Sequence, residues 1–275
     1  MGTPRFPEQA PESVVVANRG GRSPYVLICD HASNALPAEL GTLGLSADDL
    51  QRHIAWDPGA APVARYMAEI LGATLIEARF SRLAIDCNRP LDAPDLIPAL
   101  SETTPIPGNC DLTDDQRARR AALVYDPFHA AIEDVVSARL AVGRETRLVS
   151  IHSFTPVYKG VARPWHLGVI HDDDRRLALP LIAALQSFEG LKVGVNEPYS
   201  PADRVYFTLE RHARSRGLPC AMIEIRNDEI SAEAGQRKWA GLLAGILADY
   251  GPGAAWEGSG AEGNNAPAEP ATMRG

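Results

Sequence analysis

The stretch YVLICDHASN, at residues 25–34, joins an unbroken apolar run to a cluster of polar side chains. A short apolar run without alternation is typical of a strand that is buried on both faces of a sheet. Four further runs of mainly apolar residues occur later in the chain, at 73–76 (ATLI), 148–151 (LVSI), 167–170 (LGVI) and 220–225 (CAMIEI). Because amphipathic stretches separate these runs, the sequence predicts an α/β fold with a mostly parallel or mixed central sheet flanked by helices on both faces.

The expected helices are marked by apolar spacing and by signals at their ends. Apolar residues recur at helical spacing over residues 60–71, and Gly72 stands where a C-terminal cap belongs. Thr113 and Gln116 form a capping-box pattern that opens another helix, and Pro127 must break or kink the helical segment around it. Further amphipathic helices are predicted over residues 175–186, 204–216 and 233–250.

Composition and charge exclude several classes of protein. The 275 residues carry 27 Lys and Arg against 35 Asp and Glu, and this net charge of −8 argues against a nucleic-acid-binding face. No run approaches the roughly 20 apolar residues of a membrane-spanning helix. Residues 1–18 lack the basic start and apolar core of a secretory signal, so we predict a cytoplasmic protein. The four cysteines show no CxxC spacing, which predicts reduced, buried thiols.

The two ends of the chain differ in composition from the middle. Residues 251–275 are rich in Gly, Ala, Pro, Glu and Asn, offer little to bury, and are predicted to be disordered. Residues 1–12 contain three prolines and are predicted to be flexible. Because neither an internal repeat nor a linker divides the middle, residues 13–250 are predicted to form a single domain.

Polar side chains gather where predicted strands end. His31 follows the first strand, His152 follows residues 148–151, and Glu224 lies inside the last apolar run. In open α/β sheets, ligands bind outside the carboxyl ends of the strands. Histidine and carboxylate side chains are typical ligands of a catalytic zinc ion, which keeps one position for water. A zinc hydrolase also needs a carboxylate that takes a proton and a cation that binds an anionic substrate group.

Each of these residues also has a structural interpretation. A histidine after a strand is often a satisfied core or turn residue. Asp57, which precedes a proline, could be the N-cap of the helix over residues 60–71. Arg89 could form a surface ion pair, and Glu224 could pair with Arg226 or with another cation. A zinc site and an ordinary set of structural contacts are therefore both open at this point.

Six motifs are spread in order over about residues 30 to 240. They are DHASNALP (30–37), HIAWDPGA (53–60), SRLAIDCNRP (81–90), SIHSFTP (150–156), RPWH (163–166) and IEIRND (223–228). Together they resemble the N-formylglutamate amidohydrolase family. That family is distantly similar to the zinc carboxypeptidases and aspartoacylases, so the resemblance implies a phosphorylase/hydrolase-like, zinc-carboxypeptidase-like α/β fold.

The resemblance also implies roles for individual residues. SIHSFTP resembles the segment that provides the last zinc histidine, here His152, and IEIRND resembles the strand end that bears the general-base glutamate, here Glu224. DCNRP resembles the Asn-Arg pair that grips a substrate carboxylate. The candidate substrate-binding residues are Arg89, Asn88, Arg82, Arg163 and His166.

The first metal motif departs from the His-x-x-Glu pattern of the zinc carboxypeptidases, because Asn34 stands where the glutamate would be. An amide brings no charge and is a poor substitute for a carboxylate ligand. Asp57 is the preferred replacement, so the predicted Zn²⁺ ligands are His31, Asp57 and His152. His53, four residues before Asp57, is the alternative.

By resemblance, the protein hydrolyses N-formyl-L-glutamate to formate and L-glutamate, a late step of histidine breakdown. Its predicted partner is a small acidic N-acyl substrate. Two alternatives stay open: a deacylase for another N-acyl amino acid or peptide-like substrate, and a metal-free binding protein on the same scaffold. Among the remaining histidines, His129 is predicted to be structural, and His212 is predicted to face solvent or to support a site residue.

Overall fold

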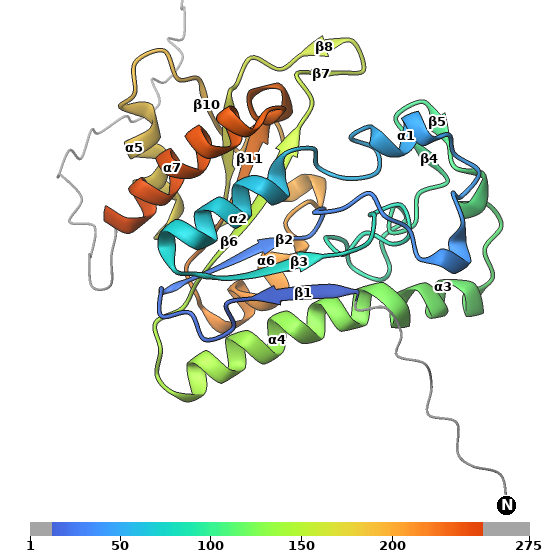
Figure 1. Cartoon of the computed structure of the whole chain (residues 1–275), viewed down its shortest axis with the longest axis horizontal. Helices are drawn as coiled ribbons and strands as arrows, with labels where there is room; N and C mark the ends of the chain where they lie inside the picture. The colour runs from blue at the N-terminus through green and yellow to red at the C-terminus, as the bar shows by residue number, and fades with distance from the viewer. Residues whose placement is uncertain (1–12, 250–275) are drawn as a thin grey trace, which may run out of the picture.

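The computed structural model describes residues 13–249, through which one seven-stranded sheet runs (Figure 1). Its strands are β1 (Val14–Ala17), β2 (Tyr25–Cys29), β3 (Thr74–Ala78), β6 (Arg147–Phe154), β9 (Leu167–Ile170), β10 (Val193–Val195) and β11 (Cys220–Arg226). Their order across the sheet is β1-β3-β2-β6-β11-β9-β10. The fold is α/β with a mixed central sheet flanked by helices, and all five strands predicted from apolar runs lie in that sheet.

The sheet is mixed and mostly parallel, as the sequence predicts. β3, β2, β6 and β11 run parallel in its middle, but β1 pairs antiparallel with β3, and β9 pairs antiparallel with β11. The apolar runs in the sequence do not predict the edge strands β1 and β10. β1 is a four-residue, largely half-buried strand beside the Pro-rich start, and β10 has three residues with Gly194 in the middle. Antiparallel edge strands on a parallel sheet are common in folds of this class.

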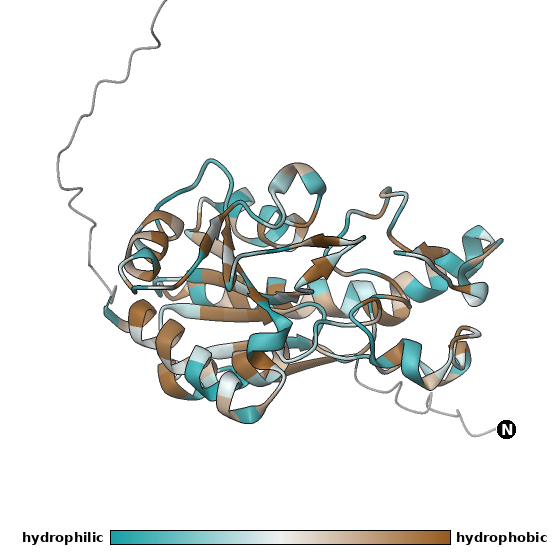
Figure 2. Ribbon diagram, turned by 90° about the horizontal axis from the view of Figure 1, so that it is seen from above, coloured by the Kyte–Doolittle hydropathy of each residue, from teal (hydrophilic) through white to brown (hydrophobic). Residues whose placement is uncertain are grey.

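Helices cover both faces of the sheet, as predicted (Figure 1). α2 (Ala60–Leu71), α5 (Ala178–Gln186) and α7 (Glu233–Asp249) pack on one face, and α4 (Asp126–Ala141) and α6 (Phe207–His212) pack on the other. Along β2, Leu27 and Cys29 point into the first core, whereas Val26 and Ile28 point into the second. Figure 2 shows hydrophobic colouring along the strands in the middle of the molecule.

Two helix ends follow the sequence signals closely. Gly72 ends α2 in the left-handed conformation at φ 61°, which confirms the predicted cap. Thr113 and Gln116 form the predicted capping box of α3 (Asp114–Arg120). Both signals depend only on neighbours within one turn, so the sequence is sufficient to predict them.

The other predicted helices differ in length from what the structure contains. Pro127 stands in the first turn of α4, directly after a π-helical turn over Ala121–Tyr125, so the α-helix is interrupted just before the proline. The helix predicted over 175–186 begins only at Ala178, and the helix predicted over 204–216 is reduced to α6. The remaining helical segments are α1 (Ala47–Gln51) and 3-10 turns at Ala38–Leu40, Pro107–Asn109, Pro201–Asp203, Arg214–Arg216 and Asn227–Ile230.

Residues 1–12 and 251–275, predicted to be flexible and disordered, lie outside the described residues. Between residues 13 and 249, no helix is long and apolar enough to cross a membrane. The predicted burial is wrong for one of the four cysteines, and the solvent-facing alternative for His212 is wrong. Cys110 is exposed because it directly follows a 3-10 turn at the surface, although the other three cysteines are buried. His212 is buried on α6, where its ring stacks on His129 of α4 with the centroids 5.1 Å apart.

Hydrogen bonds fix the protonation of this histidine pair. His129 Nε2 donates to the carbonyl of Cys87 at 3.0 Å, so its Nδ1 accepts the bond of 2.8 Å from His212 Nε2. His212 Nδ1 is therefore left unprotonated, 3.8 Å from the carboxylate of Glu133. Burial, together with nearby positive charge, lowers the pKa of His129 to about 3 and the pKa of His212 to about 4.

Acid is expected to destabilise the fold through this pair. An unfolded histidine has a pKa of about 6.5, so below that pH the unfolded chain binds protons that the folded pair does not bind. The free energy of unfolding should fall as the pH drops from about 6.5 towards 4, by up to about 1.4 kcal/mol per pH unit for each ring. Urea unfolding of the protein and of His212→Gln at several pH values measures this slope, and equal slopes would contradict the assignment.

Candidate active site

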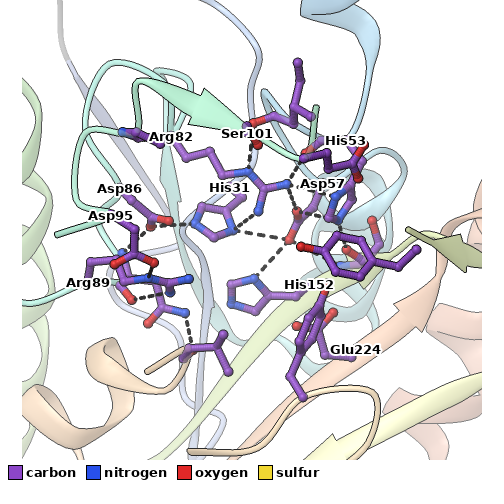
Figure 3. A pocket seen from close by; sticks show the side chains of 18 of the residues that line it. His31, His53, Asp57, Arg82, Asp86, Arg89, Asp95, Ser101, His152 and Glu224 are labelled. Atoms are coloured by element: carbon purple, nitrogen blue, oxygen red, sulfur yellow. Dashed lines mark hydrogen bonds and ion pairs between the residues drawn. The ribbon is translucent and has the colours of Figure 1, made fainter. Parts of the chain in front are cut away.

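A cavity of about 390 Å³ opens at the edge of the sheet where β2, β6 and β11 end (Figure 3). His31 follows β2 by two residues, and His152 and Glu224 face each other in register near the ends of β6 and β11. Two hairpins also contribute to the wall, β4 (Leu100–Ser101) with β5 (Thr104–Pro105) and β7 (Val157–Tyr158) with β8 (Val161–Ala162). Of the predicted site residues, His31, Asp57, Arg82, Asn88, Arg89, His152 and Glu224 line the cavity.

Asp57 lies between the two histidines. Its Oδ2 is 3.0 Å from His152 Nδ1 and 3.4 Å from His31 Nδ1, and all three side chains are buried. One ligand atom from each lies within 4.8 Å of the others, which is the spacing of groups that can share a metal ion. Asp57 is not a helix cap, because Gly59 occupies the N-cap position of α2 at φ 83°. A side chain at Gly59 would lie 2.5 Å from the carbonyl of Ile230, so only glycine fits this turn.

The outer ring nitrogens of both histidines are held by oxygen atoms. His31 Nε2 donates to Asp86 Oδ1 at 2.8 Å, and His152 Nε2 lies 2.7 Å from the hydroxyl of Ser150. A carboxylate can only accept, so Nε2 of His31 carries a proton, and Nδ1 of the same ring faces Asp57. Such outer hydrogen bonds orient histidines that bind metals. The sequence pattern alone indicates no role for Asp86 or Ser150, although Asp86 lies inside the SRLAIDCNRP motif.

The charges in this group perturb one another. Burial alone would lower the pKa of His31, but Asp86 and Asp57 outweigh burial and raise it to about 9. Burial would raise the pKa of Asp57, but Arg82 and His31 hold it well below its usual range. Burial would also lower the pKa of His152, but its hydrogen bond to Asp57 and the nearby carboxylates outweigh burial and raise it. The three side chains are thus a strongly polarised, buried set of donor atoms.

Glu224 is buried beside this group without a hydrogen bond to Oε2 from any described residue. It does not pair with Arg226, which instead binds Asp228 and Glu229. Burial, together with the charge of Asp57, raises the pKa of Glu224 to about 7 against the opposing effect of His152. A carboxylate with a pKa near neutrality can both accept and return a proton.

Arg82 is held by the protein rather than left free for a substrate. Its Nη2 pairs with Asp57 Oδ1 at 2.9 Å and donates to the carbonyls of His53 and Trp56. In this structure Arg82 supports Asp57, and its predicted contact with substrate stays a prediction. His53 Nε2 donates to the carbonyl of Ser153 at 2.6 Å, and His53 is not in the group that can hold a metal. The geometry thus favours Asp57 over His53 as the middle ligand.

Asn88 and Arg89 reach the cavity with most of their polar groups already bound. Asn88 donates to the carbonyl of Val205 and accepts from the amide of Thr208, so it mainly fixes the neighbouring loop. Arg89 Nε pairs with Asp95 at 2.8 Å, and its Nη1 donates to two backbone carbonyls. Within residues 13–249 its Nη2 has no hydrogen-bond partner, so one end of the guanidinium is open to a ligand.

Arg163 and His166 are not among the residues that line the cavity, and their role in substrate binding stays a prediction. His166 Nδ1 accepts a hydrogen bond from the backbone of Lys192, and its carbonyl accepts one from Arg226. This residue therefore ties the start of β9 to its neighbours. Arg163 is buried behind Tyr158 and Tyr199, and these two aromatic side chains do line the cavity.

Comparison with known proteins identifies the family. The family model for N-formylglutamate amidohydrolase matches residues 23–231, which span every strand of the sheet except β1 and every residue of the cavity. The chain belongs to the N-formylglutamate amidohydrolase family. This confirms the resemblance inferred from the six motifs and makes the protein an amidohydrolase by family.

Two solved structures are similar to this amidohydrolase-family chain. Gene product Atu2144 from Agrobacterium tumefaciens is 45% identical with a TM-score of 0.85, and the match covers 89% of this chain and 96% of that one. The N-formylglutamate amidohydrolase from Ralstonia eutropha JMP134 is 21% identical with a TM-score of 0.62, covering 87% and 98%. The second similarity shows a shared fold. A search of curated proteins finds no match.

Proposed function

We propose that this protein is a zinc-dependent amidohydrolase that hydrolyses N-formyl-L-glutamate to formate and L-glutamate. The observation that carries the proposal is the buried His31–Asp57–His152 group beside Glu224, whose Oε2 has no described hydrogen-bond partner. The family match supports the reaction type. By the same reasoning, the reaction takes place in the cytoplasm as a late step of histidine breakdown, on a small acidic N-acyl substrate.

The donor set fits a zinc ion. Two imidazole nitrogens and one carboxylate oxygen are ligands that catalytic zinc sites use, and a fourth position stays open for water. Zinc, when bound there, supplies Lewis acidity that polarises the formyl oxygen and lowers the pKa of water. Because the pKa of His31 is about 9, a metal ion must displace a proton from it at neutral pH. Asp86 and Ser150 hold the two rings in the orientation that presents Nδ1.

The remaining steps belong to the side chains of the protein. Glu224 accepts a proton from the water that attacks the formyl carbon, and it returns that proton to the leaving nitrogen when the C–N bond breaks. Arg89 donates from Nη2 to a carboxylate of the substrate, which places the formyl group over the site. Arg82 keeps Asp57 ionised and in place.

Two measurements on the purified protein test this function. Metal analysis without chelators should find about one zinc per chain, and a panel of N-acyl amino acids should show the fastest formate release from N-formylglutamate. If another N-acyl amino acid is cleaved faster, the proposed substrate is wrong, but the proposed reaction, hydrolysis of an N-acyl bond, still holds. A protein without metal and without hydrolysis of any substrate on the panel would favour a binding protein instead.

Substitution of Asp86 tests the proposed metal site by weakening metal binding without removing a ligand. Asp86→Asn removes the carboxylate that orients His31 but leaves all three proposed ligands in place. Loss of such an outer partner typically weakens metal binding by about 10- to 100-fold. We expect that loss in a competition titration with a chromophoric chelator, together with a lower pKa of His31. Unchanged zinc affinity in Asp86→Asn would contradict a role for the Asp86–His31 bond in metal binding.

A further inference from the structure

Arg163 is a buried cation without a carboxylate partner among the described residues. Its exposed fraction is 9%. The other arginines near the cavity are each neutralised, Arg82 by Asp57, Arg89 by Asp95 and Arg226 by Asp228. Burying a charge is costly unless it is paired or fully hydrogen-bonded. Arg163 therefore depends on contacts other than an ion pair.

Comparison with two other buried arginines shows how unusual this is within residues 13–249. Arg120 and Arg139 also lack a carboxylate partner, but they make three and four hydrogen bonds, mostly to backbone carbonyls. The side chain of Arg163 makes one hydrogen bond, from Nη1 to the hydroxyl of Tyr199 at 3.0 Å. Its guanidinium otherwise stacks on the rings of Tyr158 and Tyr199, 4.6 and 4.7 Å from their centroids, and lies 5.8 Å from the centroid of Phe154. Most of its hydrogen-bonding capacity is unused, and among residues 13–249 aromatic rings rather than a carboxylate offset its charge.

Tyr199 connects this charge to the cavity. Its side chain lines the cavity, and its hydroxyl oxygen accepts the bond from Arg163. The hydroxyl hydrogen has no acceptor in the part of the chain that the structure describes. Burial and the nearby charge of Glu224 raise the pKa of Tyr199 to about 12, so the phenol keeps its proton at neutral pH. A donor polarised by a cation is thus presented at the cavity wall.

The backbone that carries Tyr199 is packed tightly against the sheet. The carbonyl of Glu197 occupies the space that a side chain on Gly168 or Gly194 would need, less than 3.0 Å from either hypothetical Cβ atom. Gly168 pairs in register with Glu224 on one side and with Gly194 on the other. Two residues after Glu197, Tyr199 meets Arg163 beside the start of β9. The backbone just before Tyr199 therefore packs on Gly194 and Gly168, which lie beside Glu224 on neighbouring strands.

Arg89 and Tyr199 approach the cavity from different sides. Figure 3 shows Arg89 and Glu224 on opposite sides of His31 and His152. Arg163 precedes β9, which pairs with β11 on the side away from β6. An acidic substrate that bound Arg89 with one carboxylate could therefore extend past the proposed zinc ligands towards Tyr199.

We propose that Tyr199, backed by Arg163, binds a second carboxylate of the substrate, so that the enzyme selects N-acyl amino acids with two carboxylates. The inference rests on the proposed function, because Arg89 is taken to bind the first carboxylate. Tyr199 donates its hydroxyl proton to the ligand, and Arg163 is a positioning residue whose charge is balanced only when the second carboxylate is present. A single hydrogen bond to a charged group contributes about 1.5–3 kcal/mol, or roughly 10- to 150-fold in affinity.

Equilibrium binding of glutarate tests the subsite without depending on hydrolysis. By calorimetry, Tyr199→Phe should weaken glutarate binding by about 10- to 100-fold, but should change the binding of the mono-amide glutaramate little, because its one carboxylate can use Arg89. Arg163→Met should weaken the binding of glutarate by a similar factor. It should not lower the Tm, since it removes a buried charge that has no carboxylate partner among the described residues. Unchanged glutarate affinity in both variants would overturn the proposal, even if N-formylglutamate proves not to be the substrate.

Kinetics with N-formylglutamate and its two mono-amides, N-formylglutamine and N-formylisoglutamine, separates the two carboxylates. Tyr199→Phe should raise KM for N-formylglutamate and for the mono-amide that keeps the carboxylate bound by Tyr199. Arg89→Met should raise KM for N-formylglutamate and for the mono-amide that keeps the other carboxylate. Equal losses on all three compounds, or a fall in kcat at constant KM, would rule out carboxylate recognition by Tyr199. Tyr66→Phe is the matched control, because Tyr66 also stacks with an arginine, Arg237 at 4.2 Å, but lies outside the cavity. It should behave as the unmodified protein.

Discussion

Glu224→Gln is expected to lower kcat by about 10²- to 10⁴-fold while zinc content and Tm stay unchanged. Glutamine has nearly the same size and fits between Ile223 and Ile225, but it cannot accept the proton of the attacking water. Oε2 of Glu224 has no hydrogen-bond partner in the described chain, so the substitution breaks no hydrogen bond of that atom. The loss should therefore appear in the chemical step, as measured by formate release under saturating substrate.

Glu77→Gln is the matched control for this experiment. Glu77 is also a buried glutamate on a strand of the same sheet, but it pairs with Arg65 and lies outside the cavity. Its loss should leave kcat unchanged and cost at most about 1 kcal/mol of stability, because Arg65 is largely exposed. A Glu224→Gln protein that lost its zinc would make Glu224 a ligand, and one with normal turnover would remove it from the mechanism.

The central strands could be predicted from sequence because they are buried on both faces. A strand such as β2, with all five residues buried, has to be apolar throughout, so it stands out against its neighbours. The edge strands carry less of this signal, and their direction depends on how the chain returns to the sheet. The direction of β9, antiparallel to β11, depends on the path of the chain between β6 and β9. No local sequence pattern encodes that path.

The candidate site was predictable to the extent that it follows from the sheet. His31, His152 and Glu224 come together because parallel strands end at one edge, and their motifs mark those ends. The partners of these residues were not predictable. Asp86 and Ser150 are recognised only by the hydrogen bonds that they make in three dimensions.

The roles of the arginines near the cavity were also not predictable from the sequence. Arg82, Arg89 and Arg163 look alike in the sequence, since each lies in a polar motif. In the structure, the first supports Asp57, the second is partly occupied by Asp95, and the third is left without a carboxylate among the described residues. The chemistry of an arginine depends on which acceptors surround it, and those acceptors come from distant parts of the chain.

Asp57→Asn is expected to remove nearly all of the zinc and the activity, because it deletes the proposed ligand that lies between His31 and His152. The substitution is nearly isosteric and keeps the backbone bond from Asp57 to the carbonyl of His31. It removes the charge that a zinc ligand needs, and an amide is a weak replacement. The zinc content of the purified variant, measured beside Asp86→Asn, should show a complete loss for the first and a partial loss for the second.

The ion pair between Asp57 and Arg82 must be accounted for in this experiment. Arg82 pairs with its Oδ1 at 2.9 Å, and breaking a buried ion pair from one side can cost about 3–5 kcal/mol. The metal-free Asp57→Asn protein is therefore expected to be less stable in urea, which by itself could explain a loss of zinc. His152→Gln separates the two effects, because His152 contacts Asp57 but makes no described ion pair with Arg82. If His152→Gln also loses zinc while remaining stable, the loss is due to the missing ligand. If both variants keep their zinc, the His31–Asp57–His152 group is not the metal site, and Asp57 serves only to neutralise Arg82.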